Sequence, residues 1–167
     1  MAMIFVQTAF ILILIAAAVS DVISYRIPNV LVLTLGTLFI VSGSLHFAQT
    51  AWLSHFGAAL LCLAGGFLFY QFGQMGAGDV KLLTVLALWA GMGGLIALLL
   101  FVSLSGLVAL PLILLARSLV VWAQATKRWK AEWPIPRVLT KRQGVPYGVA
   151  IALGGILLIA LYPTAFH

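Results

Sequence analysis

Long stretches without a charged residue constrain this chain more than any other feature. Between Arg26 and Asp79 lie 52 consecutive positions, 27 to 78, without Asp, Glu, Lys or Arg, and a second such stretch runs from Leu82 to Ala116. Apolar residues make up 64% of the 167 residues and charged residues only 7%, against about 25% in soluble domains. A water-exposed surface cannot be covered by so few charges. The sequence therefore excludes a soluble globular domain, a disordered chain and a nucleic-acid-binding protein.

The uncharged stretches divide into six predicted membrane helices. About 20 apolar residues cross the hydrocarbon core, so positions 27 to 78 suit two spans, separated near His46–His55. The stretch from Leu82 is too long for one straight helix, and Gly91–Gly94 supplies a turn. The apolar N-terminal run has no basic residue before it, so we interpret it as a retained helix rather than a cleaved signal peptide. We predict an all-α integral membrane protein with one domain, residues 1–167, and spans at about 3–24, 28–45, 53–72, 79–90, 95–120 and 147–162.

The positive-inside rule supports the count of six. With six spans, all nine Lys and Arg residues fall on one face of the membrane, whereas five spans would place Arg26 and Lys81 opposite the others. The basic face is predicted to be cytoplasmic, with the basic loop 121–146 on that side and both termini outside. Trp122, Trp129 and Trp133 in or beside this loop are typical of an interfacial belt.

Only three acidic residues occur: Asp21, Asp79 and Glu132. Placing a carboxylate in a membrane costs free energy, so each acidic residue is expected to have a specific role. Pro28 ends the first helix shortly after Asp21, and Asp79 opens the fourth helix behind Gly76-Ala77-Gly78. Both therefore lie at the cytoplasmic boundary, whereas Glu132 lies within the basic loop as a solvated or ion-paired charge.

Two adjacent carboxylates can perform aspartyl peptide hydrolysis. They share one proton, so that the anion takes a proton from water while the neutral partner hydrogen-bonds the carbonyl under attack. A helix N-terminus favours the anion of Asp79, and a helix C-terminus disfavours that of Asp21. We hypothesise that Asp79 is the general base and Asp21 the acid, within a pair that titrates jointly.

Other interpretations of the two acids stay open at this point. Asp21 could pair with Arg26, and Asp79 could only cap its helix, in a non-catalytic structural subunit. A proton-coupled transporter would also use membrane carboxylates, although near the midplane and with a repeat that this sequence does not show.

The sequence contains no set of residues suited to bind a cofactor or a metal ion. The single Cys62 excludes an internal disulfide and a multi-cysteine zinc site, and His46 and His55 are too few for zinc. We expect no cofactor, no metal and no nucleic-acid partner.

The motifs around the two acids resemble the type IV prepilin peptidase family of integral-membrane aspartyl proteases. That family has an Asp followed by a short basic stretch and Ile-Pro-Asn, then Gly-x-Gly-Asp with a Lys close behind. The entrance to the last span, Pro146-Tyr147-Gly148, is also similar, and the resemblance extends over essentially the whole chain. The matching residues here are Asp21, Arg26, Ile27, Pro28 and Asn29, then Gly76, Gly78, Asp79 and Lys81.

The resemblance implies a prepilin leader peptidase of the bacterial inner membrane with Asp21 and Asp79 as catalytic pair, facing the cytoplasm. Its substrates would be prepilins or pseudopilins, which carry a short basic leader, usually ending in Gly, and then an apolar helix. Lys81 or Arg26 would face a Glu that the substrate carries soon after its cleavage site. An equal alternative is that they hold the two aspartates in position. Gly76, Gly78, Pro28 and Asn29 would support the site.

The chain resembles the short form of tight-adherence (Flp) pilus systems. Long members have a cysteine-rich zinc domain and also N-methylate the new terminus, so the resemblance does not carry methyltransferase activity over to this chain. Presenilin and signal peptide peptidase share Gly-x-Gly-Asp, but they pair Tyr-Asp with Pro-Ala-Leu, whereas Ser20 precedes Asp21 here.

Overall fold

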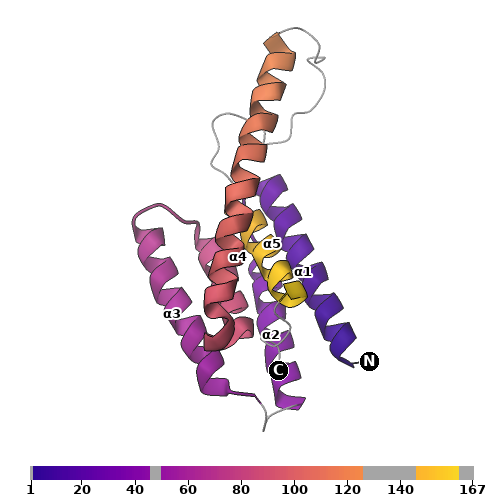
Figure 1. Cartoon of the computed structure of the whole chain (residues 1–167), viewed down its shortest axis with the longest axis vertical. Helices are drawn as coiled ribbons and strands as arrows, with labels where there is room; N and C mark the ends of the chain where they lie inside the picture. The colour runs from indigo at the N-terminus through magenta and orange to yellow at the C-terminus, as the bar shows by residue number, and fades with distance from the viewer. Residues whose placement is uncertain (1, 46–49, 126–145, 162–167) are drawn as a thin grey trace.

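A bundle of five helices makes up the computed structural model, which describes residues 2–45, 50–125 and 146–161 (Figure 1). Within these residues the secondary structure is all helical, which confirms the prediction of an all-α protein. Four of the helices lie within a few residues of predicted ones, whereas α4 covers the two predicted at 79–90 and 95–120. The helices are α1 (Ala2–Ser24), α2 (Asn29–Leu45), α3 (Trp52–Gln71), α4 (Ala77–Ala125) and α5 (Tyr147–Leu161).

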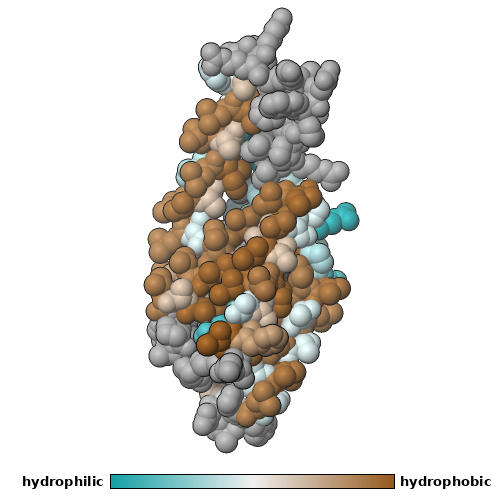
Figure 2. Space-filling model, turned by 90° about the vertical axis from the view of Figure 1, so that its right-hand side faces the viewer, coloured by the Kyte–Doolittle hydropathy of each residue, from teal (hydrophilic) through white to brown (hydrophobic). Residues whose placement is uncertain are grey.

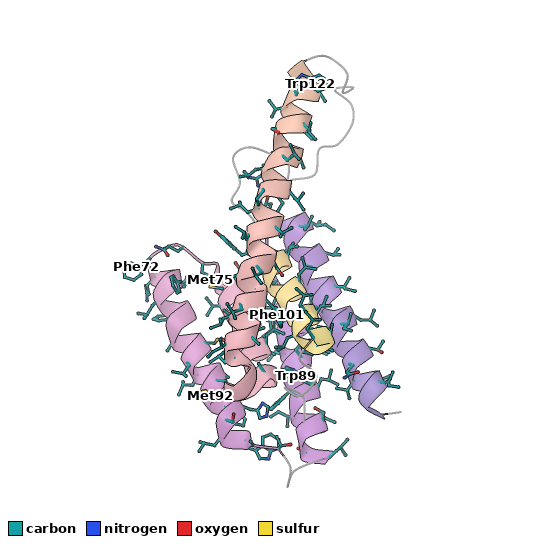
Figure 3. All side chains as sticks on the ribbon, viewed as in Figure 1. Phe72, Met75, Trp89, Met92, Phe101 and Trp122 are labelled. Carbon is teal, nitrogen blue, oxygen red and sulfur yellow. The ribbon has the colours of Figure 1, made fainter. Side chains whose placement is uncertain are left out.

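Helix α4 reverses direction at Gly91, which has non-helical angles of φ 63° and ψ −179°. Before the reversal, α4 runs along α3, so that Val80 packs at Gly66 and Gly91 at His55. After it, the chain returns to the level where α3 ends and α5 begins (Figure 1). Figure 3 shows the same course, with Met92 near the bend and Trp122 at the far end of α4.

The reversal is narrower than the four-residue turn predicted at Gly91–Gly94, because α3 stabilises the broken helix ends. The Met92 N–H donates to the Ser54 hydroxyl at 3.0 Å. The Nδ1 atom of His55 lies 2.8 Å from the carbonyl oxygen of Leu88. Since these side chains bind backbone groups that the break exposes, one glycine outside helical angles is enough to turn the chain.

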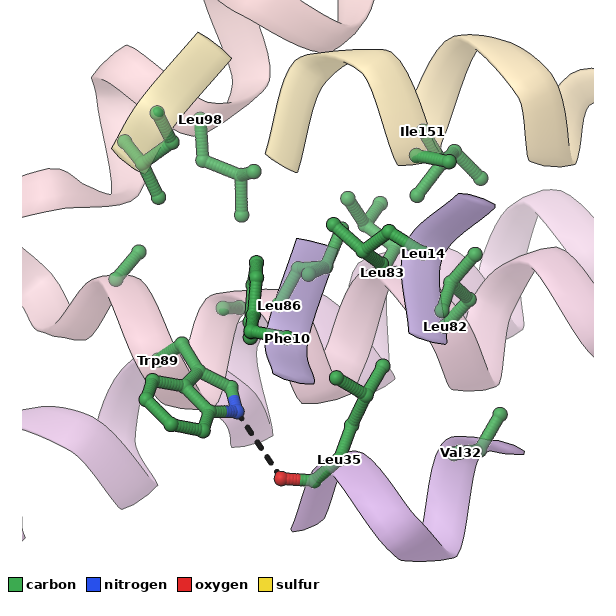
Figure 4. Packing of buried hydrophobic residues seen from close by; sticks show 14 of the residues in the cluster. Phe10, Leu14, Val32, Leu35, Leu82, Leu83, Leu86, Trp89, Leu98 and Ile151 are labelled. Atoms are coloured by element: carbon green, nitrogen blue, oxygen red, sulfur yellow. Dashed lines mark hydrogen bonds between the residues drawn. The ribbon is translucent and has the colours of Figure 1, made fainter. Parts of the chain in front are cut away.

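Helix α5 packs against α1 and α4, and its small residues allow the close contact. A Cβ atom at Gly154 would lie 2.5 Å from Val102 of α4. At Gly155 it would meet Leu14 of α1 at 2.9 Å and Leu86 of α4 at 3.0 Å. Figure 4 shows this core, in which Trp89 Nε1 also donates to the Leu35 carbonyl at 3.1 Å. Helices in lipid associate through close packing of this kind, because they gain little from the hydrophobic effect.

The outer surface is that of a membrane protein. Large apolar side chains are exposed along α1, α3 and α4, and Figure 2 shows one face covered mainly by hydrophobic residues. Three helical stretches, Ile4–Ser24, Trp52–Gln71 and Ala77–Ala123, are long and apolar enough to cross a membrane, while α2 and α5 are shorter apolar helices. These findings support a membrane protein, whereas the number of spans and the side of the termini stay predictions.

Several predicted features fall outside the described residues. They are most of the basic loop 121–146, with Trp129, Glu132 and Trp133, and His46 at the α2–α3 connection.

Replacing Gly91 with Ala is expected to destabilise the fold by about 1–3 kcal/mol, because φ near +60° with ψ near 180° is a conformation essentially restricted to glycine. The new Cβ would also lie 3.2 Å from the His55 ring. Thermal unfolding in detergent, followed by circular dichroism, measures the change. Gly93→Ala is the matched control, because a Cβ there meets nothing within 4 Å, and an equal loss in both variants would contradict the role assigned to Gly91.

Candidate active site

Three helix ends meet at one end of the bundle, and both predicted catalytic acids lie there. Asp21 is in the last turn of α1, and Asp79 is in the first turn of α4. The start of α5 completes the group (Figure 1). The site is thus assembled from parts of the chain separated by more than a hundred residues.

Asp21 is buried, with 5% of its surface exposed. Its Oδ2 atom accepts a hydrogen bond of 2.8 Å from the backbone N–H of Gly148, the second residue of α5. A Cβ at position 148 would lie 2.7 Å from the same oxygen. Only glycine therefore lets the backbone come close enough to bind this carboxylate without displacing it.

The turn after α1 is fixed by hydroxyl groups. The Ser20 hydroxyl donates to the Arg26 carbonyl at 2.8 Å, and the Ser24 hydroxyl lies 3.4 Å from the same oxygen. Tyr25 adopts φ 53°, a left-handed conformation uncommon for a residue with a side chain. These contacts turn the chain sharply after Asp21 and bring Ile27 back against the site.

Asp79 lies in the first turn of α4, where Gly76 occupies the cap position. The Val80 N–H donates to the Gly76 carbonyl at 3.1 Å. The Asp79 carboxylate accepts in return from the Gly76 backbone N–H. The bond from Gly76 N–H to the Asp79 carboxylate is one half of a capping box, with Asp in place of the usual Glu or Gln, while glycine has no side chain to form the other half. A Cβ at Gly76 would lie 3.0 Å from Asp79 Oδ2, so the small residue permits the carboxylate to fold back.

Ile27 joins the two halves of the site. Its buried side chain would lie 2.9 Å from a Cβ at Gly148 and 3.3 Å from a Cβ at Gly78. The starts of α5 and α4 therefore pack on opposite parts of one side chain, with Asp21 beside the first and Asp79 beside the second. The two carboxylates are close enough for the charge of Asp21 to act on Asp79.

The predicted supporting residues have different places. Lys81 Nζ donates to Asn29 Oδ1 at 3.1 Å and thereby ties the start of α2 to α4. The Pro28 carbonyl accepts from the Leu31 N–H in the first turn of α2. The Arg26 side chain is exposed. The glycine pair Gly76 and Gly78 contacts Asp79 and Ile27 respectively.

The contacts of Asp21 and Asp79 bear on the alternative roles of the acids. In the described part of the chain Asp21 forms no ion pair with Arg26, and its carboxylate binds the start of α5 instead. Asp79 does take part in capping, yet the same residue lies next to the second acid. Among the described residues, no group of three His, Cys, Asp or Glu side chains is arranged to hold a metal ion.

Two contacts at the site were not predicted from the sequence. Gly148 was noted only as part of a motif, with no role. The buried Arg117 of α4, which donates to the Tyr25 hydroxyl at 3.3 Å, was counted only as a basic charge. The sequence did contain an indication that Arg117 has a partner. It is the first charged residue after a long apolar run, and charged residues within a membrane are usually functional or paired.

Taken together, these features define an all-α membrane protein with one buried and one partly buried carboxylate at helix ends. The family model of the type IV leader peptidases matches residues 8–114, which are 107 of the 167 residues. The chain therefore belongs to the type IV leader peptidase family, and it is a protease. The matched range includes Asp21 and Asp79, while α5 lies outside it. Neither a curated protein nor a solved structure gives a match.

Replacing Gly148 with Ala is expected to reduce peptidase activity about 10²-fold, because a displacement of about 1 Å in a catalytic group has this effect. The added methyl group overlaps Asp21 Oδ2 and the end of Ile27. Initial rates on a leader-bearing substrate in detergent or vesicles measure the loss. Gly36→Ala on α2, where a Cβ meets nothing within 4 Å, is the control. Full activity of Gly148→Ala would show that the carboxylate tolerates displacement.

Proposed function

We propose that this protein is a prepilin leader peptidase that uses Asp21 and Asp79 as an aspartyl catalytic pair. The observation that carries the proposal is that both acids adjoin glycines packed on Ile27: Gly148 binds Asp21, and Gly78 directly precedes Asp79. The family supplies the reaction class, hydrolysis of a leader peptide. The position of both acids at one end of the bundle speaks against a transporter, whose site would lie near the midplane.

Hydrolysis by such a pair needs one ionised and one neutral carboxyl group. The ionised group takes a proton from water as the water oxygen bonds to the peptide carbonyl carbon, and the neutral group gives its proton to the carbonyl oxygen. In the second step the carboxyl group that took the water proton gives it to the amide nitrogen, the other carboxylate takes a proton back from a hydroxyl of the tetrahedral intermediate, and the C–N bond breaks as the carbonyl re-forms. The leader then ends in a carboxyl group, and the product begins with an amine. No metal or cofactor is required for this sequence of steps.

Which carboxyl is the base is not decided by the helix ends. The sequence argument considered only the C-terminus of α1 near Asp21, yet the first N–H groups of α5 also face this residue. Both acids therefore accept hydrogen bonds from backbone N–H groups at helix N-termini, so the asymmetry on which the hypothesis depended is lost. We treat the pair as one titrating unit.

The proposed membrane arrangement has six crossings, because the reversal at Gly91 divides α4 into two antiparallel segments. With six crossings all the basic residues lie on the side of the two acids, which by the positive-inside rule is the cytoplasmic side of a bacterial inner membrane. Both termini would then be outside. The proposed substrates are prepilins or pseudopilins of the Flp type, with a basic leader and a following apolar helix.

Asp21→Asn and Asp79→Asn are each expected to reduce leader cleavage about 10²- to 10⁴-fold, because each removes one partner of the proton exchange. Cleavage of a co-expressed prepilin-like substrate, followed by the shift in its mobility on a gel, measures the loss. Glu132→Gln is the charge-matched control, since it removes the third acid of the chain. Full cleavage by either Asp variant would refute the paired mechanism.

Lys81 is expected to act by positioning α4 rather than by recognising the substrate, because its ammonium group already binds Asn29. Lys81→Ala and Asn29→Ala should then lower cleavage to a similar degree, with little further loss in the double variant. Both should keep the preference for a substrate with Glu after the cleavage site. If only Lys81→Ala loses this preference, in competition between Glu- and Ala-bearing substrates, Lys81 instead reads the substrate.

A further inference from the structure

A groove lies near the two acids, although neither acid lines it. It has a volume of about 780 Å³ and is formed by the end of α3, the α3–α4 connection, the second half of α4 and the start of α5. Met75 and Tyr147 line it. Met75 precedes Gly76, which binds Asp79, and Tyr147 precedes Gly148, which binds Asp21. One end of the groove therefore reaches both carboxylates through adjoining residues.

The lining of the groove is almost entirely apolar. None of its residues is charged, and Gln74, Ser103 and Tyr147 are the only ones with a polar side-chain group. The Ser103 hydroxyl already donates to the Leu99 carbonyl of its own helix at 2.7 Å. A polar or charged ligand would thus lose its hydration without finding partners along most of the groove.

Small residues on two facing helices make the space. A Cβ at Gly106 of α4 would be in ordinary contact with Ala150 of α5, 3.7 Å away, and Ala109 continues the lining one turn further. The rims are exposed apolar side chains, Phe69 of α3 and Leu107 of α4. Met75 lies beside this half of α4 in Figure 3. The groove consequently opens toward the lipid.

We infer that this groove seats the apolar segment that adjoins the leader of the substrate, with the scissile bond at the Met75–Tyr147 end. The inference rests on the proposed function. A peptide segment held in the bilayer satisfies its backbone groups only as a helix, so it presents an apolar side-chain surface. Such a helix lays one face into an apolar groove and leaves the other to lipid. Met75 and Tyr147 of the groove each precede a glycine that binds one of the acids, and this position favours the substrate over a lipid chain.

Filling the groove separates binding of the apolar segment from the chemistry. Ala109→Phe should raise KM at least about tenfold for a membrane-anchored substrate, with little change in kcat. Cleavage of a short soluble peptide that spans the scissile bond but ends before the apolar segment should not change. Ala64→Phe is the matched control, because Ala64 is exposed on α3 away from the groove. Equal losses on both substrates, or none, would overturn the inference.

Cross-linking tests the contact without requiring catalysis. In an Asp79→Asn chain that also carries Cys62→Ala, which removes the only cysteine, Ser103→Cys should form a disulfide with a single cysteine in the apolar segment of the substrate when copper phenanthroline is added as oxidant. Leu61→Cys, exposed on α3 outside the groove, is the control and should not. Absence of the Ser103 adduct, or equal adducts at both positions, shows that the groove holds lipid or stays unused. Neither result depends on whether Asp79 is catalytic.

Discussion

The hydrogen bond between Asp21 and the start of α5 is the contact on which the arrangement of the site depends. A carboxylate buried in a membrane protein must be satisfied by donors that the protein provides, and here one donor is a backbone N–H 127 positions further along the chain. That donor reaches the carboxylate only because Gly148 has no side chain. Asp21, a proposed catalytic acid, thus also connects the first and the last described helix.

Further glycines along α5 also allow close contact with neighbouring helices. They explain how the helices of the bundle associate although the hydrophobic effect contributes little between them. Gly148 receives Asp21 and Ile27, Gly154 receives Val102, and Gly155 receives Leu14 and Leu86. Each close approach replaces lipid contacts with denser protein contacts, which is the main source of stability between membrane helices. At the groove near the acids, the small residue Ala150 of α5 faces Gly106 of α4.

Much of this organisation followed from sequence patterns, and the remainder did not, for physical reasons. The helices could be predicted because an apolar segment in a membrane must be helical to satisfy its backbone groups. Pro28, Gly91 and the glycines at positions 73–78 mark where these segments end. The nearness of Asp21 and Asp79 could be inferred only as a shared membrane face. Ile27 as the common contact and Gly148 as the donor depend on packing between distant segments, which no local pattern encodes. The hydrogen bond between Arg117 and Tyr25 was not predicted for the same reason, because counting charges placed Arg117 at the membrane surface.

The second half of α4 has a consequence for how the site meets water. From Met92 to Ala125 it contains 34 residues, about 51 Å of helix at 1.5 Å per residue, against a hydrocarbon core of about 30 Å. Arg117 is buried against Tyr25, level with the end of α1, and the turns beyond it project past the bundle (Figure 1). These last turns, with Trp122 exposed among them, extend beyond the end of the bundle that holds the carboxylates, so they border one side of the approach to that end from water (Figure 1).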